Sequence, residues 1–115
     1  MTMRTLHGQI ELPTNTPRRR ADLAVIEVRD ISLADAPSRL VAQQRLSDLE
    51  LEPGGTIPFT IEIPETAPQQ SLCINVHISI HGESQVQTGD LLTTMIHPIP
   101  SRGLLAHQRV AVKVV

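Results

Sequence analysis

Hydrophobic and polar residues alternate along most of the chain with a period of two residues. The pattern is clearest in residues 5–12, 56–63 and 71–81, and it recurs in residues 22–30. An apolar face opposite a polar face is typical of a β-strand that lies half-buried in a sheet. In residues 71–81 the inward positions are Leu, Ile and Val, and the polar positions are predicted to point outward.

Weaker segments follow the same period. They are residues 40–46, 49–51, 85–87, 91–96 and 108–115. An apolar pattern with helical spacing does not persist for three turns anywhere in the chain. The nearest candidate for a helical turn is Ala34–Asp48, which stays as an alternative to a strand there.

Seven or eight strands at this spacing predict an all-β fold, with residues 1–115 forming a single antiparallel, Greek-key-like β-sandwich domain. Leu23 and Val25 make the start of their strand apolar on both faces, which favours a central position in its sheet. Pro58 cannot donate a backbone hydrogen bond, so its strand is predicted at a sheet edge or beside a bulge.

The composition argues against nucleic acid as a partner. The net charge is -2, and Phe59 is the only aromatic residue, whereas nucleic-acid binding favours a basic face and stacking aromatic rings. The one dense basic cluster, Arg18–Arg20, is interpreted as a solvated loop, with a site for an anionic partner as the alternative.

The chain offers little for covalent chemistry. Cys73 is the only cysteine, so neither an internal disulfide nor a zinc site built from thiolates can form. No nucleophile motif or phosphate-binding loop surrounds it. We therefore expect a protein that is not an enzyme and needs no cofactor, with an enzyme built on Cys73 as the hypothesis to exclude.

Three histidines are the candidates for a metal or small-ligand site. His77 and His81 lie four residues apart on one predicted strand, roughly 13 Å from each other at the rise of a strand. That separation is too large for one metal ion, although His97 could approach either residue from a neighbouring strand. The favoured interpretation is exposed polar residues without a metal, and the alternative is a small-ligand or metal-binding β-sandwich.

Asp30, Ser32 and Asp35 cluster after the strand of residues 22–30. Their spacing is similar to part of a calcium loop, but the glycine and the distal glutamate of such a loop are missing. Asp and Ser side chains at strand ends commonly bond nearby backbone groups and close turns. The cluster is predicted to be a turn.

Five short segments carry a resemblance to a known family. They are Leu6–Ile10, Val28–Pro37, Val41–Gln44, Ile57–Pro64 and a long strand that ends at Gly82. In this order they resemble the YbaY/YscW family of bacterial lipoproteins. The resemblance extends from about Arg4 to Ile99.

The resemblance implies a compact β-sandwich without a catalytic residue. The best understood members of that family are pilotins, lipoprotein chaperones of the type III secretion apparatus that bind the C-terminal tail of the outer-membrane secretin. The start of this chain shows no leader or lipidated cysteine, and no apolar run approaches the length of about 20 residues that spans a membrane. The expected location is the bacterial envelope if a leader was removed, and otherwise the cytoplasm.

Together these observations predict a non-enzymatic protein-binding β-sandwich whose partner is an envelope or secretion component. The candidate contact residues lie on two strands: Ile57, Phe59, Ile61, Val110, Val112 and Val114. A strand edge there could add a partner strand through main-chain hydrogen bonds. The last strand has Lys113 as its only charge, which also predicts a homodimer through a free edge.

Overall fold

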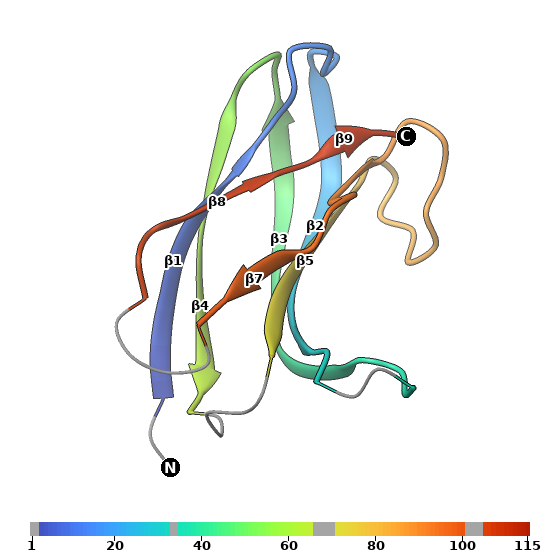
Figure 1. Cartoon of the computed structure of the whole chain (residues 1–115). Helices are drawn as coiled ribbons and strands as arrows, with labels where there is room; N and C mark the ends of the chain where they lie inside the picture. The colour runs from blue at the N-terminus through green and yellow to red at the C-terminus, as the bar shows by residue number, and fades with distance from the viewer. Residues whose placement is uncertain (1–2, 33–34, 66–70, 101–104) are drawn as a thin grey trace.

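The computed structural model describes residues 3–32, 35–65, 71–100 and 105–115, and this part of the chain is all-β. Figure 1 shows the strands arranged as two sheets that face each other. The strands are β1 (Met3–Glu11), β2 (Arg19–Asp30), β3 (Arg39–Leu51), β4 (Thr56–Pro64), β5 (Leu72–Ser79), β6 (Leu91–Leu92), β7 (His97–Ile99), β8 (Gln108–Ala111) and β9 (Lys113–Val114). The predicted β-sandwich is confirmed.

The smaller sheet has the order β4-β1-β8. The pair β1–β4 is antiparallel over nine register positions, and β1–β8 is parallel. The parallel pair departs from the purely antiparallel sandwich that the sequence predicted. Pro58 belongs to β4, where it lies opposite Gln9 of β1. Strand β4 stands at the end of this sheet, so the predicted edge position is confirmed.

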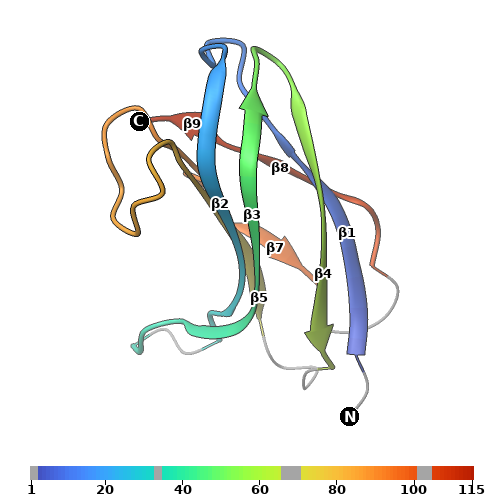
Figure 2. The ribbon, with the colours of Figure 1, turned by 180° about the vertical axis from the view of Figure 1, so that it is seen from behind.

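The larger sheet has the order β3-β2-β5-β6-β9, and β7 also pairs with β5. Strand β2, which carries Leu23 and Val25, lies between β3 and β5 as predicted. The last segment joins the two sheets, because β8 pairs with β1 whereas β9 pairs with β6. Figures 1 and 2 show this segment running obliquely across the sandwich. Strands β8 and β9 stand at the ends of their sheets and each is paired on one side, so a homodimer through a free edge stays a prediction.

Residues 39–51 form one strand where the sequence predicted two pieces or a helical turn. Antiparallel pairing with β2 extends from Arg19↔Leu51 to Asp30↔Arg39, and the register shifts once between Val28 and Arg29. The apparent break comes from Asp48, whose φ of 55° interrupts the alternation locally while the strand continues.

The chain after β5 differs most from the prediction. Strand β5 ends at Ser79, residues 85–87 are not a strand, and residues 91–96 contribute only the short β6. Gly82 and Gly89 have positive φ values of 78° and 98°, a backbone region that favours glycine. The chain turns at these residues and returns to pair with β5 as β6. Hydrogen bonds to Asp90 hold the segment between β5 and β6 in place.

The core between the sheets is almost wholly aliphatic. Leu6, Ile10, Ile26, Ile63 and Ile74 are fully buried. Gly8 has no side chain because a Cβ atom there would lie 2.6 Å from the Phe59 ring and 2.8 Å from the backbone oxygen of Gln108. The glycine therefore lets β4 and β8 pack closely on either side of β1.

The six predicted contact residues belong to this core. Five of them are buried, and the sixth, Val114, is half-buried and packs against the same cluster. The others are Ile57, Phe59, Ile61, Val110 and Val112. Their apolar side chains contribute to folding and are covered within the chain, so a partner would reach these strands through their backbone. A role for the backbone edge of β4 stays a prediction.

Candidate functional site

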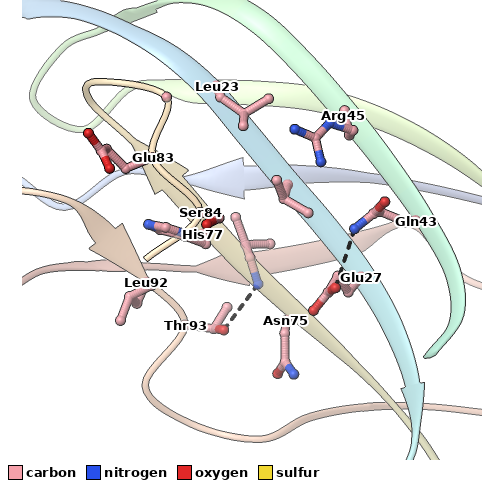
Figure 3. Close-up of a pocket in the computed structure, with 13 residues that line it drawn as sticks. Leu23, Glu27, Gln43, Arg45, Asn75, His77, Glu83, Ser84, Leu92 and Thr93 are labelled. Carbon is pink, nitrogen blue, oxygen red and sulfur yellow. Dashed lines mark hydrogen bonds between the residues drawn. The ribbon is translucent and has the colours of Figure 1, made fainter. Parts of the chain in front are cut away.

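A groove lies on the outer face of the larger sheet, and its volume is about 480 Å³. Strands β2, β3, β5 and β6 and residues 82–84 line it. The face is the outer one because Leu23, Val25 and Glu27 alternate with Ala24 and Ile26, which are fully buried between the sheets. Figure 3 shows the side chains that surround the groove.

Aliphatic side chains contribute to the lining of the groove. Leu23 and Val25 from β2 and Leu92 from β6 are all half-buried. Strand β2 is apolar on both faces at this point because its inner residues fill the core and its outer residues line the groove. The apolar residues on both faces of β2 therefore indicate a central strand whose outer residues line the groove.

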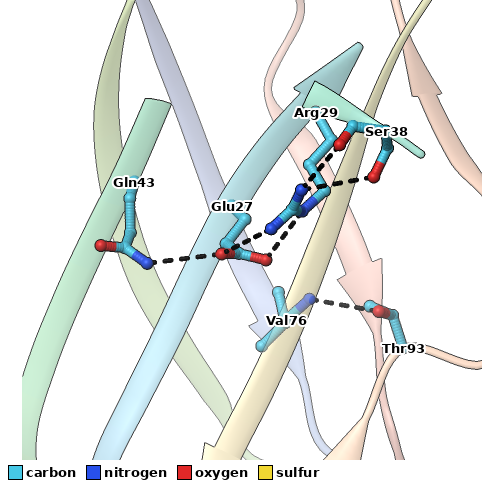
Figure 4. Close-up of polar contacts among 6 residues, drawn as sticks. All are labelled: Glu27, Arg29, Ser38, Gln43, Val76 and Thr93. Carbon is cyan, nitrogen blue, oxygen red and sulfur yellow. Dashed lines mark hydrogen bonds and ion pairs between the residues drawn. The ribbon is translucent and has the colours of Figure 1, made fainter. Parts of the chain in front are cut away.

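Glu27 is a charged residue of the groove whose carboxylate is paired with Arg29. Its carboxylate accepts hydrogen bonds from Arg29 Nε at 3.1 Å and Arg29 Nη2 at 3.3 Å, and from Gln43 Nε2 at 3.4 Å. Arg29 also donates to the backbone and side-chain oxygens of Ser38, as Figure 4 shows. This network fixes one end of the groove and leaves Glu27 with little capacity for a ligand.

Two other charged residues line the groove. Arg45 lies on β3, and Glu83 lies in the segment that follows β5. Within the described residues, neither side chain makes an ion pair or a side-chain hydrogen bond. Both are exposed, so both charges are available to a bound molecule.

Asp90 holds the segment after β5 in place. Its side chain is 1% exposed. Oδ1 accepts the Ile80 N–H at 3.0 Å, while Oδ2 accepts the Gln87 N–H at 2.9 Å and lies 2.8 Å from His77 Nε2. The carboxylate thus connects β5 with the segment that borders the groove. It contacts His77 and Ile80, which lie before and after Ser79 in the chain. Ser79 is buried where the alternation predicted exposure.

Opposing effects act on the pKa of Asp90. Burial raises it, but hydrogen bonds from His77, Gln87 and Ile80 and the charge of His77 lower it, and the net result is a pKa below the usual value. The carboxylate is therefore ionised at neutral pH, and the folded state favours that form.

The pair of His77 and Asp90 has the composition of a general base with an orienting carboxylate. Cys73 is not placed to act as a nucleophile with this pair. That thiol is buried, and burial raises its pKa while the charge of Arg29 lowers it in part. Four residues of strand also place it roughly 13 Å from His77.

The three histidines of the predicted site lie in different environments. His77 is engaged by Asp90, His97 Nε2 lies 2.8 Å from Gln108 Oε1, and His81 is exposed. In the described ranges, no group of three His, Cys, Asp or Glu residues is arranged to hold a metal ion. A metal site on these histidines therefore has no geometric support there, while His77 lines the groove.

The cluster after β2 is a turn, as predicted. The Ser32 N–H donates to Asp30 Oδ1 at 2.9 Å, and Ser32 Oγ donates to the same oxygen. The same hydroxyl accepts the Ser71 N–H at 2.8 Å and so ties the turn to the start of β5. Asp35 is exposed, and Leu33 and Ala34 lie outside the described residues.

The arginine cluster lies at the opposite end of β2 from this turn. Arg18 and Arg20 approach Glu52 and Glu50 at 3.5 Å and 4.0 Å, and these side chains are largely exposed. Arg19 and Arg20 begin β2, so the predicted loop is corrected to the start of a strand. The paired carboxylates reduce the positive charge of this exposed cluster.

Comparisons with known proteins identify the fold. One solved structure, described as an alternative pilotin from the type II secretion system of Vibrio cholerae, is similar over 99% of this chain and 98% of that chain. The TM-score is 0.75 and the sequence identity is 14%. No family model matches the chain. No curated protein matches it either.

This chain therefore has a pilotin-like β-sandwich fold. The part of the chain that the structure describes includes no helix long and apolar enough to cross a membrane.

Proposed function

We propose that this protein is a non-enzymatic β-sandwich that binds a protein component of a bacterial secretion system through the groove on the outer face of its larger sheet. The observation that carries the proposal is the likeness to the pilotin over nearly the whole of both chains. The groove supplies a binding surface that the core residues cannot supply, because it is open and partly apolar.

The proposal includes membership in the YbaY/YscW family and a location in the bacterial envelope. Residues of the resemblance support it: Val28–Asp30 forms the end of β2, the turn at Ser32 follows, and Ile57–Pro64 forms most of β4. A pilotin-like fold is consistent with the same family. The turn at Ser32 and the edge strand β4 are the features that a relative would share.

The positions of His77 and Cys73 favour a binding role over catalysis built on that cysteine. His77 is tied to a structural carboxylate, and Cys73 is buried and distant from it. An open, mixed polar and apolar groove without a reactive group is typical of recognition sites.

A comparative pull-down tests this function. The purified chain and the variant Leu23→Ser/Val25→Ser are immobilised and exposed to a native bacterial lysate, and retained proteins are identified by mass spectrometry. We expect an envelope or secretion component on the wild type and a clear loss of it on the variant. Circular dichroism shows whether the variant is folded.

The outcomes separate the parts of the proposal. Equal retention of one partner by both folded proteins would place the contact elsewhere on the molecule. A wild type that retains no specific protein would overturn the binding function itself.

A further inference from the structure

The groove presents one unpaired charge of each sign on two different elements. Arg45 comes from β3 and Glu83 from the segment after β5, and β2 lies between them in the sheet. Figure 3 shows the two side chains on either side of Leu23. We propose that the groove binds a polypeptide segment in which an acidic and a basic residue flank apolar side chains, so that Arg45 pairs with the acid and Glu83 with the base. This inference rests on the proposed protein-binding function.

The other residues of the groove fit the apolar and backbone parts of such a segment. Leu23, Val25 and Leu92 are half-buried in the free protein, and an apolar side chain would cover the rest of their surface. Asn75 is exposed beside them, and its amide can both donate to and accept from a peptide backbone.

Other ligands fit these charges less well. A phosphate or nucleic acid would meet the unpaired carboxylate of Glu83 beside a single arginine. An uncharged lipid chain would cover Arg45 and Glu83 without pairing them, which is unfavourable. A second copy of this chain offers Met95 and Ile96 as exposed apolar residues, but residues 93–97 include no acid, lysine or arginine.

Synthetic peptides can test the sign of each subsite. Three peptides with the same central leucines are acetylated and amidated so that their termini are uncharged. One carries a glutamate and a lysine at its two ends, the second two glutamates and the third two lysines. Titration of the ¹⁵N-labelled protein at low salt should show the mixed peptide binding about threefold more tightly than either other peptide. The shifts should include the amides of Leu23 and Val25.

Charge reversal should switch this preference. Arg45→Glu makes both walls acidic, so the peptide with two lysines should become the tightest ligand. Glu83→Lys makes both walls basic, so the peptide with two glutamates should take that place. The matched controls are Arg39→Glu, elsewhere on β3, and Glu62→Lys, on the other sheet. Both control positions are exposed and outside the groove, and both variants should keep the preference for the mixed peptide.

Each contrary result has a distinct meaning. Equal affinities, no binding of any peptide, or an unchanged preference in Arg45→Glu and Glu83→Lys would overturn the charge assignment. Free leucine that binds at the same amides as tightly as the mixed peptide would assign the groove to a small zwitterion and also overturn it. A lysate protein held equally by the wild type and both reversed variants would leave the proposed function intact and overturn only this inference.

Discussion

The two sheets have the same alternating pattern but very different outer faces. On the smaller sheet, exposed polar residues such as Thr5, His7 and Thr60 form a solvated surface, with a contact of 3.3 Å between Thr60 Oγ1 and His7 Nδ1. On the larger sheet, the half-buried Leu23 and Val25 occupy the equivalent outward positions. Alternation therefore indicates which face of a strand points into the core. Apolar residues at outward positions, such as Leu23 and Val25, indicate where the outer face forms the groove.

The difference extends to how each face is supported. The outer face of the larger sheet is bordered by a segment in which Asp90 contacts His77 of β5, Ile80 just after β5, and Gln87 of the segment itself. On the smaller sheet, strands β1 and β4 pair along nine positions. We thus expect changes on the two sheets to have separable effects on stability and on binding.

Asp90→Ala should have the largest effect. It removes the acceptor of the buried Ile80 N–H and of the Gln87 N–H, and we expect it to lower the free energy of unfolding by about 3 kcal/mol. Urea denaturation measures the change. Glu62→Ala, on the exposed face of the smaller sheet, is the control and should cost less than about 0.5 kcal/mol. Similar decreases in the free energy of unfolding for both variants would contradict the role of Asp90 in holding the segment after β5.

Gly8→Ala should destabilise the smaller sheet without touching the groove. The added Cβ would meet the Phe59 ring and the Gln108 carbonyl, and we expect a loss of about 2 kcal/mol. Thermal unfolding measures this loss, and titration with the mixed-charge peptide should give the wild-type affinity. A variant as stable as the wild type would contradict the close packing of β1 between β4 and β8.

Acid should weaken the larger sheet through Asp90. Its pKa is lower in the folded protein than in the unfolded chain, so its contribution is complete above the ordinary value of about 3.9 and is lost as the pH falls through the folded value. The stability difference between wild type and Asp90→Asn should therefore be constant near neutral pH and shrink below about pH 4. A difference that grows with acid would reverse the sign of this linkage.

Arg18→Ala should have the smallest effect. Its ion pair with Glu52 is long at 3.5 Å, and both side chains are mostly exposed, so we expect a change below about 0.5 kcal/mol in the free energy of unfolding. Chemical denaturation at low and high salt measures it. A loss comparable to that of Asp90→Ala would show that this ion pair stabilises the start of β2 as strongly as Asp90 stabilises the segment after β5.

The sequence was informative where burial follows strand period. The alternation identified β1, β2, β4 and β5, and the two apolar faces around Leu23 and Val25 indicated a central strand. It also assigned the turn at Asp30 and Ser32, because the Asp30 carboxylate accepts the Ser32 N–H two residues later.

The chain after β5 and the groove were not predicted, because tertiary contacts define them. Asp90 organises its segment through residues three to thirteen positions away, and no local pattern indicates those hydrogen bonds. The groove combines Arg45, Glu83 and Leu92 from three separate elements. The apolar residues of β4 and β8 were assigned to a contact surface because one-sided periodicity cannot distinguish a core from an interface.

Site-specific photo-crosslinking in a bacterial envelope extract tests most directly whether the outer face of the larger sheet is the binding surface. The photoreactive residue benzoylphenylalanine replaces Asn75, which is exposed in the groove, or Thr60, which is exposed on the smaller sheet. We predict a discrete adduct with one protein from position 75 and none from position 60. An adduct from position 60 alone, or from neither position, would contradict the assignment of the groove as the binding surface.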